Sequence, residues 1–346
     1  MWFDSRARQG YTARAFCIFQ TVAGFIMRPA NIIATLVASL SLNAAAQNWP
    51  SKPIRMLVPY PAGGTSDILA RLMGPRMTET WGPQVLVDNR LGANGNIAME
   101  LTARAPADGY TMVLTDLGNL VISPAMYSKL PFDITRDLSP IAMISYSPHL
   151  LTTHPSVPAK TVKELMALAK ASPGKFNVPV GLGAAVHLAA LSLEQRTGNK
   201  WVYVPTKGGQ ASIMAVATGE GDFLFMGMLQ TLPHVKAGRL KLIAVSSEKR
   251  DPNTPSTPTM QETPGLEGFV TGTYQGIMGP AKIPAEIISK VNGEVKRILG
   301  LQDMRDRLAG YSTTPMPMTP QEQAKWMAVE KEKWAAVVKT SGFKID

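Results

Sequence analysis

A glycine-rich turn at residues 59–67, with the sequence PYPAGGTSD, is the first segment whose composition suits ligand binding. It follows an apolar run and precedes residues with helical spacing, which predicts a connection from a strand to a helix. Its glycines let the backbone turn tightly and approach a ligand. Thr65, Ser66 or Asp67 could cap the helix, and backbone N–H groups at a helix start favour an anion. The same composition also fits a connection with no binding role, so both interpretations stay open.

Three other turns lie between an expected strand and an expected helix. Residues 181–187 (GLGAAVH) would bring a second helix start to the same ligand, where His187 could donate to an acid or simply stabilise its helix. In residues 204–210 (VPTKGGQ), Lys207 is either a cation for an anionic ligand or a solvated lysine, the commoner state of that side chain. Residues 89–95 (NRLGANG) are expected to shape a loop rather than to bind.

The elements that must position these turns alternate along the chain. Apolar runs predict strands at 54–60, 85–88 and 111–115, with helical spacing at 67–77 and 95–105 between them. This β-α-β-α-β order predicts a parallel sheet with helices on both faces. A second alternating set then follows: helices at 162–171, 186–197 and 210–218, and strands at 176–180, 201–204, 222–225 and 240–245.

Two extended segments are expected to join the two sets. Residues 141–152 form an unusually long extended run, and residues 274–278 could be a return crossing, followed by helices at 285–299, 303–309 and 320–339. Two doubly wound α/β lobes joined by crossing strands would make a hinged clamshell. The predicted boundaries are 47–147 for the first part of lobe 1, 148–248 for lobe 2, and 249–346 for the return to lobe 1. In such folds, ligands lie at the carboxyl ends of strands and the amino ends of helices.

The N-terminal residues 1–46 have the pattern of a secretory signal peptide. Arg28 precedes an apolar run at 31–42, and three alanines at 44–46 form an A-x-A cleavage site. A run of about 12 residues is too short to span a bilayer as a helix. Cleavage after Ala46 predicts a periplasmic protein, and Met27 would itself make a good start. The alternative interpretation is a buried core helix.

Composition excludes several classes of function. The 346 residues are too many for one ordinary core and indicate two domains. The single cysteine, Cys17, lies before the cleavage site, which excludes disulfides and cysteine chemistry in the mature chain. The four histidines lack metal-ligand spacing, and no nucleophile elbow, dinucleotide fingerprint or P-loop is present. We therefore expect no enzyme, no metal site and no cofactor.

The net charge of +10 would attract anionic small molecules weakly and at long range. Nucleic acid would also fit this sign. However, the basic residues are scattered without a dense run, and an exported protein rarely meets nucleic acid. Nucleic acid is therefore not an expected partner.

Eight short segments, in this order and spacing, resemble the Bug-type receptors, the extracytoplasmic solute-binding proteins of tripartite tricarboxylate transporters. They are residues 49–55, 58–64 with Asp67, 87–93, 107–111, 130–133, 137–141, 234–239 and 242–246. The resemblance runs from about Trp49 to the C-terminus. It implies a type II periplasmic-binding-protein fold, or Venus-flytrap, that holds a ligand carboxylate between its lobes through backbone amides and bridging waters.

By matching position, the resemblance implies which residues contact the ligand. In the first turn they are Tyr60, Ala62, Gly64, Thr65 and Asp67. In the second turn they lie from Gly183 to His187, including Ala184 and Ala185, and the third turn is expected to add Lys207 and Gly208. The implied partners are a small carboxylate and membrane transporter subunits, and the protein is expected to be a monomer.

Three departures from the family pattern bear on the ligand. Ala184 replaces a usual hydroxyl residue, Thr206-Lys207-Gly208 replaces a frequent Tyr-Arg-Gly, and Met226-Gly227 stands where an Asp often follows the strand. Each change removes or weakens a polar group near the expected cleft, and a pocket cannot keep buried polar partners unmatched. The hypothesis is a carboxylate with an apolar or aromatic body, rather than an aspartate-like or citrate-like ligand.

The same fold also suits two other roles. The protein could present its ligand to a membrane sensor kinase, because both roles need the same closure around a ligand. A cytoplasmic ligand-sensing regulator is disfavoured by the signal peptide and by the lack of a helix-turn-helix segment.

Overall fold

The computed structural model describes residues 49–345. From Lys52 onwards the chain forms one compact unit, which contains both lobes of the fold. The predicted signal peptide and the alternative start at Met27 lie outside the described residues. Within 49–345, no helix combines the length and the apolar content that a bilayer crossing requires.

The first lobe is built on a mixed sheet. Its centre is parallel, as predicted: β1 (Ile54–Val58) lies between β2 (Val85–Asn89) and β3 (Thr111–Asp116). The sheet then continues with antiparallel strands in the order β10-β4-β9-β3-β1-β2, through β9 (Gly272–Pro280) and β10 (Thr314–Met318). The sheet is mixed because the chain returns from the second lobe along β9.

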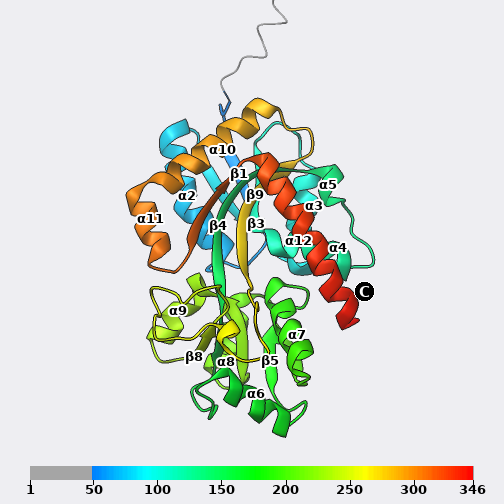
Figure 1. The fold of residues 1–346 in the computed structure, drawn as a ribbon. Helices are drawn as coiled ribbons and strands as arrows, with labels where there is room; N and C mark the ends of the chain where they lie inside the picture. Colours follow the sequence, from blue (N-terminus) through cyan, green and yellow to red (C-terminus); the bar gives the residue numbers. More distant parts are fainter. Residues whose placement is uncertain (1–48, 346) are drawn as a thin grey trace, which may run out of the picture. The chain divides into compact units, whose positions relative to one another are not determined.

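Helices cover both faces of this sheet (Figure 1). Since β2 and β3 flank β1 on opposite sides, right-handed crossovers place α2 and α3 on opposite faces. Figure 1 shows α10 and α11 on the side of α2, and α4, α5 and α12 on the side of α3. The bounds are α2 Thr65–Trp81, α3 Asn96–Ala103, α4 Leu117–Met126, α5 Ile134–Asp137, α10 Ala285–Gly300, α11 Gln302–Ala309 and α12 Pro320–Ser341.

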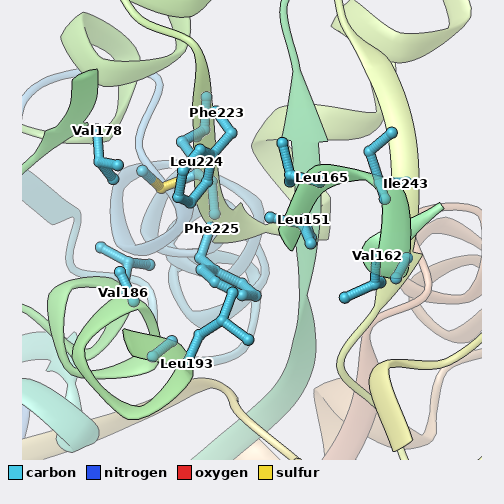
Figure 2. Close-up of a cluster of buried hydrophobic side chains, with 14 of the residues drawn as sticks. Leu151, Val162, Leu165, Val178, Val186, Leu193, Phe223, Leu224, Phe225 and Ile243 are labelled. Carbon is cyan, nitrogen blue, oxygen red and sulfur yellow. The ribbon is translucent and has the colours of Figure 1, made fainter. Parts of the chain in front are cut away.

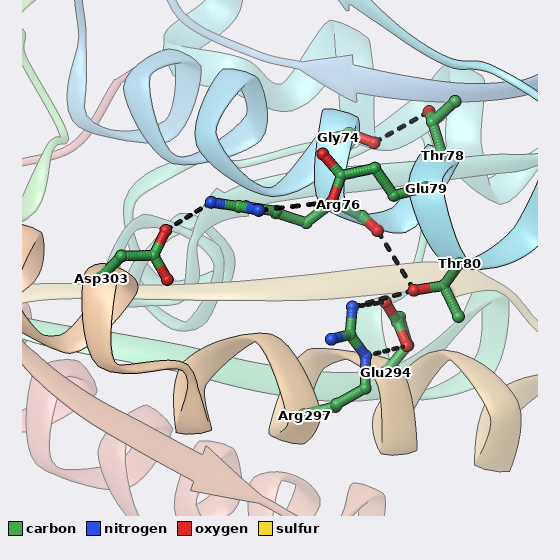
Figure 3. Close-up of polar contacts among 8 residues, drawn as sticks. All are labelled: Gly74, Arg76, Thr78, Glu79, Thr80, Glu294, Arg297 and Asp303. Carbon is green, nitrogen blue, oxygen red and sulfur yellow. Dashed lines mark hydrogen bonds and ion pairs between the residues drawn. The ribbon is translucent and has the colours of Figure 1, made fainter.

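Polar contacts on one side of the sheet join α2 to α10 and α11 (Figure 3). The guanidinium of Arg76 pairs with Asp303, and that of Arg297 donates to Thr80 Oγ1 at 2.9 Å. The Arg297 guanidinium also pairs with Glu294 at 2.7 Å, which raises the pKa of Arg297. The pair of Arg76 with Asp303 is exposed, and exposed ion pairs contribute about 0–1 kcal/mol each, so this contact fixes where the helices lie more than it stabilises them.

The crossing strand β4 (Leu138–Thr153) runs through both lobes. Its first part pairs with β9 and β10, and its last residues pair with β7 (Phe223–Gly227) and β8 (Lys241–Val245). The changeover lies at Pro148, which pairs with Gly272, and His149, which pairs with Gly227. Sequence analysis predicted this strand at 141–152, and the structure confirms it with a longer start.

The second lobe adds a separate parallel pair to β7 and β8. This pair is β5 (Asn177–Val180) and β6 (Val202–Pro205), and the helices are α6 Val162–Ala171, α7 Ala185–Thr197, α8 Gly209–Ala217 and α9 Met228–Lys236. Side chains from β7, β4, β8, α6 and α7 form its core, as Figure 2 shows for Phe223, Phe225, Leu151 and Ile243. This packing sets the starts of α7 and α8.

The helix α7 also packs against the first lobe. Its Ala185, Leu188 and Leu191 belong to the buried cluster that contains Trp334 and Val338 of α12. Because α7 packs against the cores of both lobes, its start is held close to the first-lobe turns. The predicted lobe boundaries at 147 and 248 stay a prediction.

Candidate ligand-binding site

A cavity of about 90 Å³ lies between the two lobes. The first lobe contributes Tyr60, Pro61, Gly64, Thr65, Ser66, Asn94, Asp116, Thr273 and Gln275. The second lobe contributes Gly181, Ala184, Ala185, Val186, Gly208, Gly209, Gln210, Met226 and Gln230. The two sets differ in chemistry, because the hydroxyls and the carboxylate come from the first lobe, whereas backbone and apolar side chains dominate the second.

The turn between β1 and α2 is organised by a side chain that follows it. Gly63 has φ +80°, and its backbone N–H donates to Asp67 Oδ2 at 3.0 Å. The N–H of Gly64 closes the turn on the carbonyl of Pro61 at 3.2 Å. Gly64 is the N-cap of α2 and has no side chain to cap it, so the helix start at Thr65 faces the cavity uncapped.

The turn between β5 and α7 repeats this geometry residue for residue. Gly183 has φ +81°, and its backbone N–H donates to His187 Nδ1 at 3.2 Å. The N–H of Ala184 donates to the carbonyl of Gly181 at 3.1 Å. Ala184 is the N-cap of α7 and makes no side-chain cap. The two lobes therefore hold their cavity-facing helix starts in the same way, with acceptors of different charge.

A third helix start meets the first two. The helix α8 follows Gly208, an N-cap with φ +116° and no side-chain cap. A Cβ at Gly208 would lie 3.1 Å from Pro61 of the first lobe, so a residue without a side chain lets the lobes approach. Gln210 Nε2 also donates to the carbonyl of Gly63 at 3.0 Å, which joins the lobes directly.

These three helix starts set the electrostatics of the cavity. Each helix carries about half a positive charge at its amino end, and its first N–H groups lack partners within the helix. Three such ends from two lobes converge on one small space. The arrangement suits an anion with oxygen acceptors, such as a carboxylate.

Of the residues predicted to bind, seven line the cavity: Tyr60, Gly64, Thr65, Ala184, Ala185, Val186 and Gly208. Lys207 lies instead in an adjoining outer cavity of about 440 Å³, which shares Tyr60, Pro61, Asn94, Gly181 and Gly208 with the inner one. Ala62 is exposed and Gly183 is buried, and neither lines the inner cavity.

Asp67 lies behind its turn and does not line the cavity. Its side chain is buried and accepts hydrogen bonds from Gly63 N–H, Arg71 Nε and Asn89 Nδ2, each at 3.0 Å. Burial alone would raise its pKa, but the hydrogen bonds from Arg71, Gly63 and Asn89 outweigh burial and hold the pKa below its ordinary value. This geometry favours a role in holding the turn, and direct contact with a ligand stays a prediction.

His187 is likewise behind its turn. Burial lowers its pKa to about 4, and Nδ1 accepts from Gly183, so the ring is neutral with its proton on Nε2. The ring packs edge-on against Tyr203 at 4.7 Å and Phe343 at 4.5 Å between centroids. The position favours the structural alternative for this histidine over donation to a ligand.

Most of the polar side chains of the lining were not predicted from the sequence. Asp116, Gln230, Thr273 and Gln275 were not predicted, and the loop that carries Asn94 was expected only to shape the chain. Asp116 ends β3, so the rule that ligands lie at the carboxyl ends of strands could have found it. Thr273 and Gln275 reach the cavity through the return pairing of β9 with β4 and β3, which no local signal predicts.

Several buried polar atoms of the lining have no partner among the described residues. They are Thr65 Oγ1, Asn94 Nδ2 and Gln230 Oε1. Ser66 Oγ, in contrast, donates to Gln275 Oε1 at 2.7 Å. Unmatched buried polar atoms cost about 1–3 kcal/mol each, so these three atoms favour a polar occupant. In the described part of the chain, no three His, Cys, Asp or Glu side chains are grouped so that they could hold a metal ion.

Comparison with known families and sequences gives one consistent result. The model of the tripartite tricarboxylate transporter family receptor matches residues 69–343. Protein BugT of Bordetella pertussis is 30% identical over 318 residues, which cover 91% of this chain and 97% of that protein. A UPF0065 protein of Bordetella bronchiseptica is 31% identical over 314 residues, covering 90% of this chain and 93% of that protein.

Solved structures agree with the sequence matches. Rpa4515 of R. palustris with adipate has a TM-score of 0.83 at 30% identity, covering 86% of this chain and 99% of that one. MatC of Rhodopseudomonas palustris with bound malate has a TM-score of 0.79 at 28% identity, covering 84% and 100%. The periplasmic binding protein BugD has a TM-score of 0.81 at 26% identity, covering 86% and 99%.

Proposed function

Because the chain belongs to the tripartite tricarboxylate transporter receptor family, whose members bind solutes and are not enzymes, we propose that it captures a small carboxylate in the periplasm and presents it to the membrane subunits of such a transporter. The observation that carries this proposal is the convergence on one cavity of three helix starts, from both lobes, whose N-cap residues make no side-chain cap. The adipate and malate bound in two similar structures support a carboxylate as the ligand class.

The second lobe supports a ligand with an apolar body. Its side of the cavity presents Ala184, Val186 and Met226, and two of these are the positions at which polar groups were expected to be lost. Apolar surface buried against such a wall contributes about 25 cal/mol per Å². The first lobe is more polar than the sequence suggested, so one end of the ligand must match hydrogen-bonding groups.

The test is to cap the start of one helix, α7, with a side chain introduced by mutation. In Ala184→Asp, the new carboxylate at the N-cap of α7 would accept from the N–H groups that a ligand carboxylate would use. N-cap Asp in place of Ala stabilises a helix by about 0.5–2 kcal/mol. We expect the melting temperature of the unliganded protein to hold or rise, while calorimetric binding of carboxylates is lost.

The matched control is Pro284→Asp, which places the same group at the exposed N-cap of α10, outside the cavity. This variant should bind carboxylates like the parent protein. If Ala184→Asp is well folded and still binds them with unchanged affinity, capture at these helix starts is wrong.

A further inference from the structure

The cavity has one charged side chain among the described residues that line it, and that side chain is acidic. Asp116 is buried, and neither lysine nor arginine contributes to the inner lining. Its Oδ1 accepts from the N–H of Gly118 at 2.8 Å, which caps the start of α4. A site that bound only anions would be expected to have a basic side chain or no charged side chain, but not an acidic one.

The carboxylate of Asp116 lies next to the proposed anion site. A Cβ built on Gly118 would be 3.0 Å from Asp116 Oδ1 and 3.4 Å from the Cβ of Ala185, so the carboxylate and the first residue of α7 flank the same point. On its other side, Asp116 pairs with Gln275 in the sheet, and the Gln275 side chain bonds Ser66 in the first turn of α2. Asp116 is therefore close to two of the three helix starts.

Other atoms of the lining are hydrogen-bond acceptors that a donor group of the ligand could satisfy. Gln230 Oε1 is a buried carbonyl oxygen without a partner among the described residues. Thr65, only 6% exposed, has an unpartnered hydroxyl, and this hydroxyl can accept as well as donate. Acceptors from both lobes thus line the same cavity as Asp116.

We propose that the ligand is an amino carboxylate, whose carboxylate meets the helix starts of α2, α7 and α8 while its ammonium donates to Asp116. The inference rests on the proposed function and names the ligand class of the same site. A dicarboxylate would bring its second negative charge into a small space that already contains a fixed one, where such repulsion is strong. An ammonium instead gains a charge-assisted hydrogen bond.

The test compares ligands that share a carbon skeleton and differ in the amino group. The pairs are alanine and propanoate, leucine and 4-methylpentanoate, and phenylalanine and 3-phenylpropanoate, with malate and adipate as dicarboxylates. In titration calorimetry at pH 7, the amino member of at least one pair should bind about tenfold to a hundredfold more tightly than its partner, the range for a hydrogen bond to a charged group. Both dicarboxylates should bind more weakly than that amino member.

Asp116→Asn then tests the residue. Asn caps helices as well as Asp does, so α4 should form while the charge is lost. The variant should lose the preference for the amino member and bind the des-amino member as well as or better than the parent. Asp133→Asn makes the same change at the N-cap of α5, outside the cavity, and should alter nothing.

The outcomes separate this inference from the proposal beneath it. If des-amino acids or dicarboxylates bind to the parent protein as tightly as the amino carboxylates, or if Asp116→Asn keeps the amino preference, the inference is wrong while carboxylate capture stands. If no carboxylate of any series binds, the proposed function itself is rejected. The ligand comparison on the parent protein decides the matter even if the variant does not fold.

Discussion

The side chains with the most conspicuous chemistry in the two main turns serve the turns themselves. Asp67 and His187 each lie four residues after a glycine with positive φ, and each accepts that glycine's backbone N–H. A ligand can then be held by backbone groups, because the acidic and basic side chains are used to shape the backbone. A carboxylate does this in one lobe and a neutral imidazole in the other.

A neutral imidazole in this position makes stability depend on pH. Burial lowers the pKa of His187 to about 4 and that of His149 to about 3, from an ordinary value of 6.5. Below pH 6.5 the unfolded chain takes up protons that the folded protein does not, so the free energy of unfolding falls as pH falls from 6.5 towards about 4. Each histidine should cost about 2 kcal/mol between pH 7 and pH 5.

His187→Gln tests this, since the glutamine carbonyl can still accept from Gly183 without titrating. Urea unfolding at pH 7 and pH 5 should show a loss between the two that is about 2 kcal/mol smaller in the variant than in the parent protein. Carboxylates titrate alike in both proteins, so the difference reports the histidine. Equal losses would mean that the pKa of His187 is not lowered in the folded protein.

At the scale of elements, each turn depends on a left-handed glycine. Gly183 has φ +81°, and Gly198, at the other end of α7, has φ +66°. An alanine at either position would be strained by about 1–2 kcal/mol. The two glycines differ in function, because Gly183 shapes the turn at the cavity whereas Gly198 ends the helix with no heavy atom within 4 Å of an added Cβ.

We therefore expect Gly183→Ala and Gly198→Ala to lower the free energy of unfolding, and only Gly183→Ala to weaken ligand binding. At Gly183 an added Cβ would also come within 2.7 Å of Ile345 Cδ1, which should make its cost the larger one. Denaturant unfolding and titration calorimetry of both variants measure the two effects. A matching loss of affinity in Gly198→Ala would show that binding follows the overall stability of α7 rather than the turn.

Sequence patterns gave the elements better than the cavity. The helix α6 was predicted at its observed bounds, 162–171, and the starts of α7 and α8 within one residue. In contrast, α4 was missed, because its sequence LGNLVISPAM contains glycine, proline and β-branched residues and lacks clear helical spacing. Because α4 was missed, its N-cap residue Asp116, which lines the cavity, was missed as well.

The rest of the lining depends on contacts that no local pattern encodes. Gln275 is placed opposite Asp116 by the antiparallel register of β9 with β3, across more than 150 residues of chain. Family resemblance predicted ligand contacts in three turns, and residues of all three turns line the cavity. It did not distinguish Asp67, which holds a turn, from Asp116, which lines the cavity.

At the scale of the whole molecule, the proposed function requires the two lobes to approach, and a few contacts decide how closely they do. Gln210 bonds to the carbonyl of Gly63 across the cleft, and α7 packs into the core of the first lobe. A ligand that bonds to both lobes adds to these contacts only when the lobes are close. Its affinity therefore includes the free energy of closing.

Gly208 is a position at which this closing can be tested without removing a side chain from the cavity. In Gly208→Ala the new Cβ would lie 3.1 and 3.2 Å from the rigid ring of Pro61 in the other lobe, so the lobes should stay slightly apart. We expect the affinity for the ligand to fall about tenfold, since overpacking typically costs about 1–3 kcal/mol. Gly219→Ala also places an alanine at a glycine with positive φ (+82°), but the nearest neighbour of its Cβ, at 3.7 Å, lies within the same lobe, so this variant should bind normally. Adding Pro61→Ala to Gly208→Ala removes the obstructing ring atoms and should restore most of the lost affinity, a coupling that two independent defects would not show. If the double variant binds no better than Gly208→Ala alone, the approach of the lobes at this point does not limit binding.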